Sequence, residues 1–154
     1  MTGAEEHAFL DEKTTEIGTL VVVVGPSGVG KDSLIDFARR HFDGRDDIRF
    51  ARRSITRPSD AVGEDHHPVT PVAFEELSSS GAFSVSWHAH GLGYGISTDV
   101  LDDLAEGRTV VVNGSRSALA SFRGAFPKLL VVNVTARADV LAKRLATRGR
   151  ETEE

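Results

Sequence analysis

The sequence contains no cysteine, which excludes disulfide bonds, thiolate metal sites and cysteine nucleophiles. It also lacks a long apolar stretch: the longest runs, residues 20–24 and 129–132, fall far short of the ~20 residues of a membrane-spanning helix. A basic excess is missing as well, since 18 Lys and Arg stand against 23 Asp and Glu, a net charge of −5. That balance argues against a general nucleic-acid binder. Residues 1–18 are acidic where a secretory signal would be basic and then apolar, so we expect a flexible tail and a cytoplasmic protein.

The 154 residues are enough for one domain with one substantial core. Apolar runs predict strands at residues 20–24, 48–54, 83–87, 109–112 and 129–134. Helical spacing and capping residues predict helices at 31–41, 71–79, 98–107, 115–126 and 136–148, with Ser97 or Thr98 and Ser115 or Ser117 as alternative caps. The polar stretch 57–67 and the glycine-dense stretch 91–95 are expected to be loops. Alternating strands and helices indicate an α/β fold around a parallel sheet.

One motif follows the first apolar run and opens the first helix. It reads Gly25-Pro26-Ser27-Gly28-Val29-Gly30-Lys31-Asp32-Ser33. This is the GxxxxGK core of a phosphate-binding P-loop, in the strand-to-helix context that such a loop requires. Its glycines let successive backbone N–H groups point into one cavity, the helix N-terminus adds positive potential, and Lys31 reaches the terminal phosphates. The motif therefore predicts a site for the phosphates of ATP.

The residue after Lys31 departs from the general P-loop motif. Serine or threonine at this position contacts Mg²⁺, whereas this chain has Asp32 followed by Ser33. A carboxylate is a good ligand for Mg²⁺. Either Asp32 binds the ion, directly or through water, or Ser33 does so in a shifted loop; we favour Asp32.

The P-loop and several later segments resemble the guanylate kinase group of nucleotide kinases. Residues 54–58, Ser-Ile-Thr-Arg-Pro, are similar to a segment of that group whose arginine holds the acceptor phosphate, which implies this role for Arg57. The stretch 91–95 is similar to a wall of the acceptor site, and the resemblance implies that Tyr94 binds phosphate there. Arg144 and Arg148 match an arginine-bearing lid, which implies that they stabilise the phosphoryl group during transfer.

The residues that read guanine in that group do not match. Val85 stands where a guanylate kinase has a glutamate, and Arg53 stands where it has a guanine-reading serine. Six motifs, taken in order, instead resemble the ribose 1,5-bisphosphate phosphokinases of phosphonate metabolism. They lie at residues 25–33, 54–57, 64–66, 86–95, 112–116 and 144–151. The resemblance implies a kinase that uses Mg²⁺ and ATP to convert ribose 1,5-bisphosphate into 5-phosphoribosyl 1-diphosphate.

This resemblance also implies an architecture. We expect a three-layer P-loop kinase fold with a central parallel sheet over residues 19–154, an acceptor-binding segment at about 50–95 and a lid at about 137–154. The resembling family continues beyond the lid with a helix and a strand–helix portion, so the C-terminal part is expected to be missing here. Apolar surface left exposed by that absence would favour a homodimer.

A sugar bisphosphate has no base to read but carries an extra phosphate. The gain of Arg53 and Arg116 fits such an acceptor, because guanidinium groups bind phosphate oxygens in a fork geometry. Asn113 ends a buried strand at the edge where ligands bind in open α/β sheets, so it either contacts the acceptor or Mg²⁺ or only begins a turn. The residues expected to bind the acceptor are Arg53, Arg57, Glu64, His66, His88, Tyr94, Asn113 and Arg116.

Two other functions stay open at this point. One is a guanylate kinase with an unusual acceptor pocket, which Val85 argues against. The other is a non-catalytic, guanylate-kinase-like interaction module, which the intact Gly30 and Lys31 argue against. The expected partners are small molecules, with no nucleic acid and no membrane.

Overall fold

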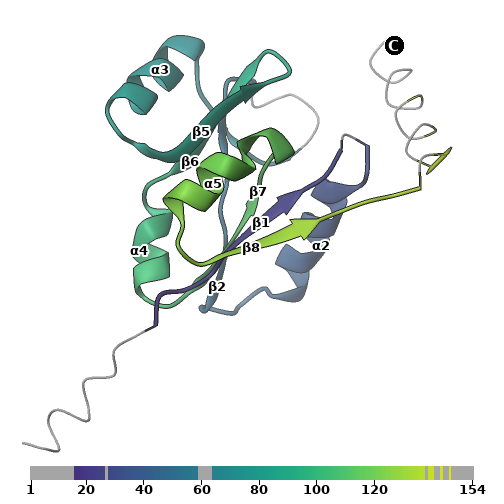
Figure 1. Ribbon diagram of the computed structural model, residues 1–154, viewed down its shortest axis with the longest axis horizontal. Helices are drawn as coiled ribbons and strands as arrows, with labels where there is room; N and C mark the ends of the chain where they lie inside the picture. The colour runs from purple at the N-terminus through teal and green to yellow at the C-terminus, as the bar shows by residue number, and fades with distance from the viewer. Residues whose placement is uncertain are drawn as a thin grey trace, which may run out of the picture.

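A computed structural model describes residues 16–26, 28–58, 64–137, 139, 140, 143 and 146 (Figure 1). The strands are β1 (Leu20–Val24), β2 (Ile48–Phe50), β3 (Ser54–Ile55), β4 (His67–Pro68), β5 (Phe83–Ala89), β6 (Leu92–Ser97), β7 (Thr109–Asn113) and β8 (Leu129–Asn133). The helices are α2 (Lys31–His41), α3 (Pro71–Ser79), α4 (Val100–Ala105) and α5 (Leu119–Ala125), with a 3₁₀ turn η1 (Arg116–Ala118) before α5. None of the helices in these described ranges is long and apolar enough to cross a membrane.

The first sheet is parallel and has the strand order β2-β7-β1-β8. Because side chains alternate along a strand, Leu20, Val22 and Val24 of β1 share one face. These three residues belong to the main core together with residues of α4 and α5, such as Leu104 and Phe122. Helix α2 lies on the opposite face (Figure 1). The expected three-layer α/β fold with a central parallel sheet is therefore confirmed.

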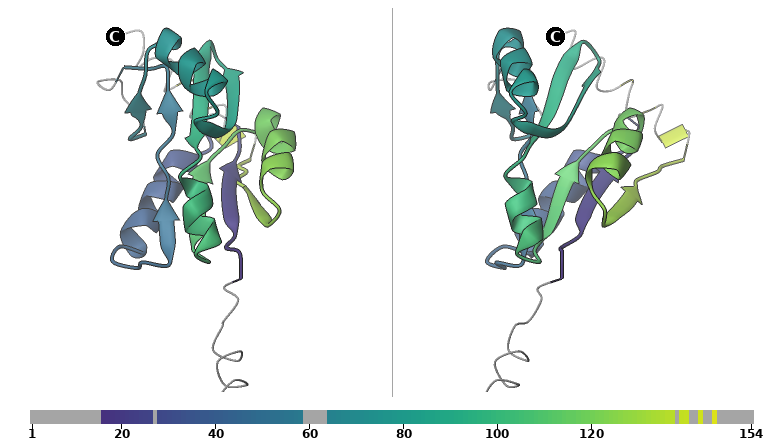
Figure 2. Two further views of the ribbon diagram at one scale, coloured as in Figure 1. Left: turned by 90° about the vertical axis from the view of Figure 1, so that its left-hand side faces the viewer. Right: turned by 60° about the vertical axis from the view of Figure 1, so that its left-hand side comes forward.

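The second sheet has the strand order β4-β3-β6-β5 and takes all of its strands from residues 54–97. It lies with α3 beyond the carboxyl ends of the first sheet's strands (Figure 2). The expected strand 48–54 is in fact two strands, because the chain leaves the first sheet after Phe50 and enters the second at Ser54. Part of the predicted loop 57–67 also becomes sheet, since His67 begins β4 and pairs with β3.

The prediction of a loop at 91–95 is wrong, because Leu92 begins the strand β6. A Cβ at Gly93 would lie 2.8 Å from the ring of Phe74, and one at Gly95 would lie 2.6 Å from the ring of Phe83. The glycines thus leave room for two aromatic rings that pack directly on the strand. Only the tip of the hairpin, at His90 and Gly91, has the positive φ angles (54° and 74°) of a tight two-residue turn.

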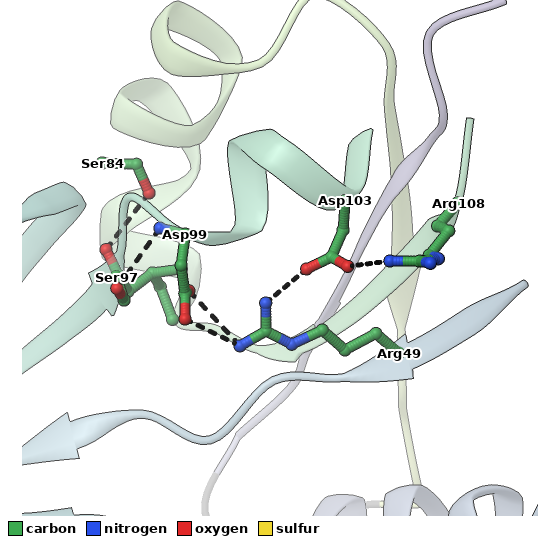
Figure 3. A network of polar contacts seen from close by, with 7 residues as sticks. Arg49, Ser84, Ser97, Asp99, Asp103 and Arg108 are labelled. Carbon is green, nitrogen blue, oxygen red and sulfur yellow. Dashed lines mark hydrogen bonds and ion pairs between the residues drawn. The ribbon is translucent and has the colours of Figure 1, made fainter. Parts of the chain in front are cut away.

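An ion-pair network joins the two ends of the segment that builds the second sheet (Figure 3). Arg49 on β2, just before the segment, donates to Asp103 on α4 and, at 3.2 Å, to Asp99 at the start of α4. Arg108 donates to the other oxygen of Asp103 at 2.8 Å. These hydrogen bonds hold together the points at which the chain leaves the first sheet and returns to it.

The helix ends agree in part with their predicted caps. Thr70 accepts a hydrogen bond from the Ala73 N–H at 3.1 Å, as expected of an N-cap before Pro71. Helix α4 starts later than predicted: Ser97 accepts from the N–H of Asp99, and Asp99 is the N-cap. Residues 1–15 of the expected tail, and most of the expected last helix 136–148, lie outside the described residues.

Candidate functional site

The P-loop joins the end of β1 to the start of α2, as the sequence predicts. Gly28 and Gly30 have φ angles of 81° and 92°, which side chains other than glycine rarely adopt. No side chain caps the N-terminus of α2, whose N-cap is Gly30. The N–H groups of the first turn of α2, which form the positive end of the helix dipole, therefore stay available to an anion bound at the loop. Ser27 lies outside the described residues.

Lys31 lies at the junction of the P-loop and the end of β7. Its ammonium group is 3.4 Å from the carbonyl oxygen of Gly114. Burial lowers the pKa of Lys31 below its ordinary value, and the neighbouring Arg53 cation lowers it further. A lysine in such surroundings has a strong electrostatic preference for anionic ligands, because they would offset both effects.

A cavity of about 360 Å³ opens between the P-loop and the second sheet. It brings together most of the residues that the sequence singles out. Those in its wall are Gly25, Pro26, Gly28, Val29, Gly30, Lys31, Asp32, Ser33, Arg53, Arg57, Glu64, Tyr94 and Asn113. The predicted donor and acceptor groups thus line one continuous space.

A buried ion pair lines the cavity on the side where the sequence predicts the acceptor. Arg53 is only 8% exposed and donates to both carboxylate oxygens of Glu64, with its Nε 3.0 Å from Oε2. The guanidinium also lies over the rings of Tyr94, at 4.7 Å, and Trp87, at 5.9 Å. Burial lowers the pKa of Arg53 to about 10. Its charge is thus balanced within the protein by Glu64 before any ligand binds.

Asn113 connects the two sides of the cavity from the end of β7. Its Nδ2 donates to Asp32 Oδ1 at 2.8 Å and lies 3.5 Å from Glu64 Oε1. Two carboxylate acceptors on this side mean that the amide oxygen, Oδ1, faces away from them. This oxygen is buried and has no hydrogen-bond partner.

His66 is buried but does not line the cavity. Its Nε2 is 2.8 Å from the carbonyl oxygen of Arg57, and its Nδ1 is 3.1 Å from that of Glu64. The imidazole thus contacts the backbone of two residues of the cavity wall that are seven positions apart in the chain. The sequence predicts contact of His66 with substrate or with pocket groups, and the contacts seen are with pocket groups, the backbones of Arg57 and Glu64.

Two other expected acceptor residues are not brought to the cavity. His88 lies on the opposite face of β5 from Trp87, where its ring packs edge-on against Phe74 and lies 3.5 Å from Glu75. Arg116 is exposed and donates to Asn133 Oδ1 at 3.1 Å. Arg144 and Arg148, the expected lid residues, lie outside the described residues.

Unpartnered polar atoms gather at this one cavity. Over the described ranges, the buried side-chain atoms without a hydrogen-bond partner are Arg57 Nε and Nη2, Trp87 Nε1 and Asn113 Oδ1, and all three residues line the cavity. Buried polar groups are normally paired, so such a concentration is typical of a ligand site. The sequence leaves Trp87 open between a core residue and a pocket-wall residue, and the structure places it in the cavity wall. Strand alternation puts Trp87 on the same face of the sheet as its cross-strand partner Tyr94.

The described residues contain no group of three or more His, Asp or Glu side chains arranged to hold a metal ion. Asp32 and Ser33, in the first turn of α2, nevertheless fit Mg²⁺ bound to a nucleotide. Such Mg²⁺ uses one or two protein oxygens and takes its other ligands from phosphates and water.

A P-loop on a central parallel sheet, facing a second sheet across one cavity, defines the guanylate kinase fold. In agreement, the chain superimposes on the crystal structure of guanylate kinase from Anaplasma phagocytophilum with a TM-score of 0.70 and 16% identity, over 84% of this chain and 67% of that one. Sequence relatives are more specific. The chain is 58% identical over 139 residues to the ribose 1,5-bisphosphate phosphokinase PhnN of Rhizobium etli, covering 90% of this chain and 71% of the relative.

A second relative gives the same result. The ribose 1,5-bisphosphate phosphokinase PhnN of Agrobacterium fabrum is 53% identical over 133 residues, which are 86% of this chain and 73% of the relative. The chain therefore belongs to the ribose 1,5-bisphosphate phosphokinase PhnN family. No protein-family profile matches it.

Proposed function

We propose that the protein transfers the γ-phosphoryl group of ATP to the 1-phosphate of ribose 1,5-bisphosphate, forming ADP and 5-phosphoribosyl 1-diphosphate. Its membership of the PhnN family supports this activity. The observation that carries the proposal is the position of Arg57. This arginine has two buried, unpartnered nitrogens in the same cavity as Lys31 and the P-loop. A phosphate is the ligand that suits both ends of that cavity.

On the donor side, the backbone N–H groups of Gly28 to Ser33 would surround the β- and γ-phosphates, and Lys31 would contact their oxygens. Asp32 and Ser33 are our candidates for holding Mg²⁺. The ion, when bound, would neutralise charge on the donor phosphates. Asn113 donates to Asp32 at 2.8 Å and so holds this carboxylate next to Lys31. The donor groups would thus be ordered before ATP arrives.

On the acceptor side, Arg57 and Tyr94 would hold a phosphate of the sugar. An oxygen of the 1-phosphate dianion attacks the γ-phosphorus of ATP while the bond from that phosphorus to the β–γ bridging oxygen breaks. The bridging oxygen leaves with its electron pair as part of ADP. Charge is conserved, and no proton has to be removed from the acceptor. Catalysis therefore requires positioning and charge neutralisation rather than a general base.

The acceptor side supports a sugar phosphate over guanine. Val85, at the place of the guanine-reading glutamate, is 4% exposed in the apolar core, where it faces Ile96 across the hairpin. Arg53, at the place of the guanine-reading serine, already pairs with Glu64. Neither residue offers a free acceptor to the N–H groups of a guanine.

Two parts of the proposal rest on the resemblance alone. We propose that residues 50–95 act as the acceptor-binding segment and residues 137–154 as a lid over it. We also propose that Arg144 and Arg148 stabilise the phosphoryl group during transfer. His88 and Arg116 would act on the acceptor only if they move toward the cavity, because His88 lies behind β5 and Arg116 bonds to Asn133.

The test is ADP release from Mg²⁺ and ATP, with ribose 1,5-bisphosphate and GMP as parallel acceptors. Turnover with the sugar bisphosphate alone is expected, and Arg57→Gln should raise its KM by about tenfold or more, because a charge-assisted hydrogen-bond pair is lost. Arg123→Gln, an exposed arginine on α5 that does not line the cavity, is the matched control. Turnover with GMP alone would show a guanylate kinase, and absence of ATP binding would show a non-catalytic module.

A further inference from the structure

Trp87 combines three properties that a core tryptophan does not need together. It is 9% exposed, it lines the cavity beside Tyr94, and its Nε1 is buried without a hydrogen-bond partner. The rings of Trp87 and Tyr94 stack with an interplanar angle of 8° and centroids 5.4 Å apart. One face of the indole is therefore occupied by protein, so its N–H group is the polar feature it can offer a ligand.

The surroundings of Trp87 offer this N–H group no acceptor of their own. No acceptor lies within hydrogen-bond distance of Trp87 Nε1 in the part of the chain that the structure describes, and Arg53, which lies over the indole, has only donors to give. Ala89 and Leu92, the next pair along the hairpin on the same face, have apolar side chains. Asn113 Oδ1, the buried acceptor without a partner in the same cavity, is not within hydrogen-bond distance of Trp87 Nε1 either, so in this arrangement a ligand has to supply the oxygen.

We propose that Trp87 is a specificity-determining residue whose Nε1–H donates a hydrogen bond to an oxygen of the bound sugar bisphosphate. This inference rests on the proposed function, and it assigns to the acceptor site a donor that neither the relatives' names nor the family resemblance provides. Arg57, just after β3, and Trp87, within β5, would then contact the same molecule. Arg57 would contribute its charge and Trp87 a directional hydrogen bond. Binding requires a small rotation of the indole or of its neighbours, since Nε1 is covered before the ligand enters; side-chain adjustments of this size are common on binding.

The single tryptophan of this chain allows a clean test. Production in a tryptophan auxotroph supplied with benzothienylalanine replaces only Trp87, keeps a bicyclic aromatic ring, and exchanges the N–H for sulfur. We expect the KM for ribose 1,5-bisphosphate to rise about tenfold, because a hydrogen bond from a buried donor to a charged oxygen is lost. The kcat and the KM for ATP should change less than twofold. Equal rises in both KM values would overturn the inference, because they would show general damage to the cavity.

A second measurement uses the unaltered protein and so does not depend on whether the substituted protein folds. With ¹⁵N-labelled tryptophan, the protein gives one indole N–H signal in a ¹H–¹⁵N correlation spectrum. Saturating ribose 1,5-bisphosphate should move this signal downfield, whereas ATP alone should move it much less. Turnover of the sugar bisphosphate without movement of the signal would overturn the role of Trp87 and leave the proposed function standing. No turnover with ribose 1,5-bisphosphate would overturn the proposed function, and this inference with it.

Discussion

Removal of the Glu64 carboxylate should destabilise the protein strongly, because it leaves the buried Arg53 cation without its hydrogen-bonded counter-charge. The side chains of Arg53 and Glu64 are only 9% and 16% exposed. After Glu64→Leu, the ring faces of Tyr94 and Trp87 would remain, at 4.7 and 5.9 Å, together with an electrostatic interaction with the Asp32 carboxylate that includes no hydrogen bond. Cation–π contacts of this kind recover only part of the lost interaction.

The size of the effect can be worked out in two ways. Burial lowers the pKa of Arg53 well below its ordinary value, to about 10, which corresponds to about 3 kcal/mol of penalty against the charged form. Breaking one partner out of a buried ion pair costs about 3–5 kcal/mol in measured cases. For a domain of this size, about 3 kcal/mol lowers the melting temperature by roughly 10 °C.

The assay is a double-mutant cycle followed by thermal unfolding. Glu64→Leu and Arg53→Met should each lower the melting temperature, whereas the double variant should recover most of the loss, because two apolar side chains can replace a buried pair with little change in stability. Arg45→Met is the control, since Arg45 pairs with Asp47 on the exposed surface, and it should leave the melting temperature unchanged. A double variant as unstable as Glu64→Leu would refute the reasoning, as it would show that packing rather than charge decides the stability.

Three further predictions concern ionisation and packing. Burial and the Arg53 cation lower the pKa of Lys31, so kcat/KM should begin to fall at a lower alkaline pH than an ordinary lysine would cause. The double variant Arg53→Met with Glu64→Leu lacks that cation and should move this fall to higher pH. The folded chain releases the Lys31 proton at a lower pH than the unfolded chain, so the free energy of unfolding should increase as the pH rises through that range. Thermal unfolding of Lys31→Met and of the unaltered chain at several pH values measures this contribution. Gly95→Ala should cost about 1–3 kcal/mol in a urea titration, because its Cβ would lie 2.6 Å from the Phe83 ring. Gly124→Ala, in α5 with open space around its Cβ, should instead stabilise by about 0.5–1 kcal/mol, and equal effects at both glycines would contradict this reasoning.

The P-loop could be predicted from sequence because everything that defines it is local. The strand, the glycines, the lysine and the helix are consecutive, so β1 and α2 form where the sequence predicts them. The parallel strands β1, β7 and β8 were also visible as apolar runs. Their order in the sheet depends on pairing between distant segments and is known only from the structure.

The acceptor side was harder to predict because its wall is assembled from distant parts of the chain. Gly93 and Gly95 predict a loop from sequence alone. The structure shows that they are glycines in a strand because the rings of Phe74, from α3, and Phe83 occupy the space above them. A similar limit applied to the choice between His88 and Trp87. Alternation separates their faces, but the sequence does not show which face of β5 meets the cavity.

The Arg49 network has a consequence for how this fold can change. Arg49, Asp99 and Asp103 tie β2 to α4, the two elements between which the chain makes its whole excursion into the second sheet. The chain between β2 and α4 is therefore an insertion whose two ends are held together by ion pairs. A different hairpin and helix could replace it while the sheet that carries the P-loop stays unchanged. Exchange of this insertion alone could change the acceptor preference. The positions of Arg49 and Asp99 are therefore suitable joining points for chimaeras designed to use a new acceptor.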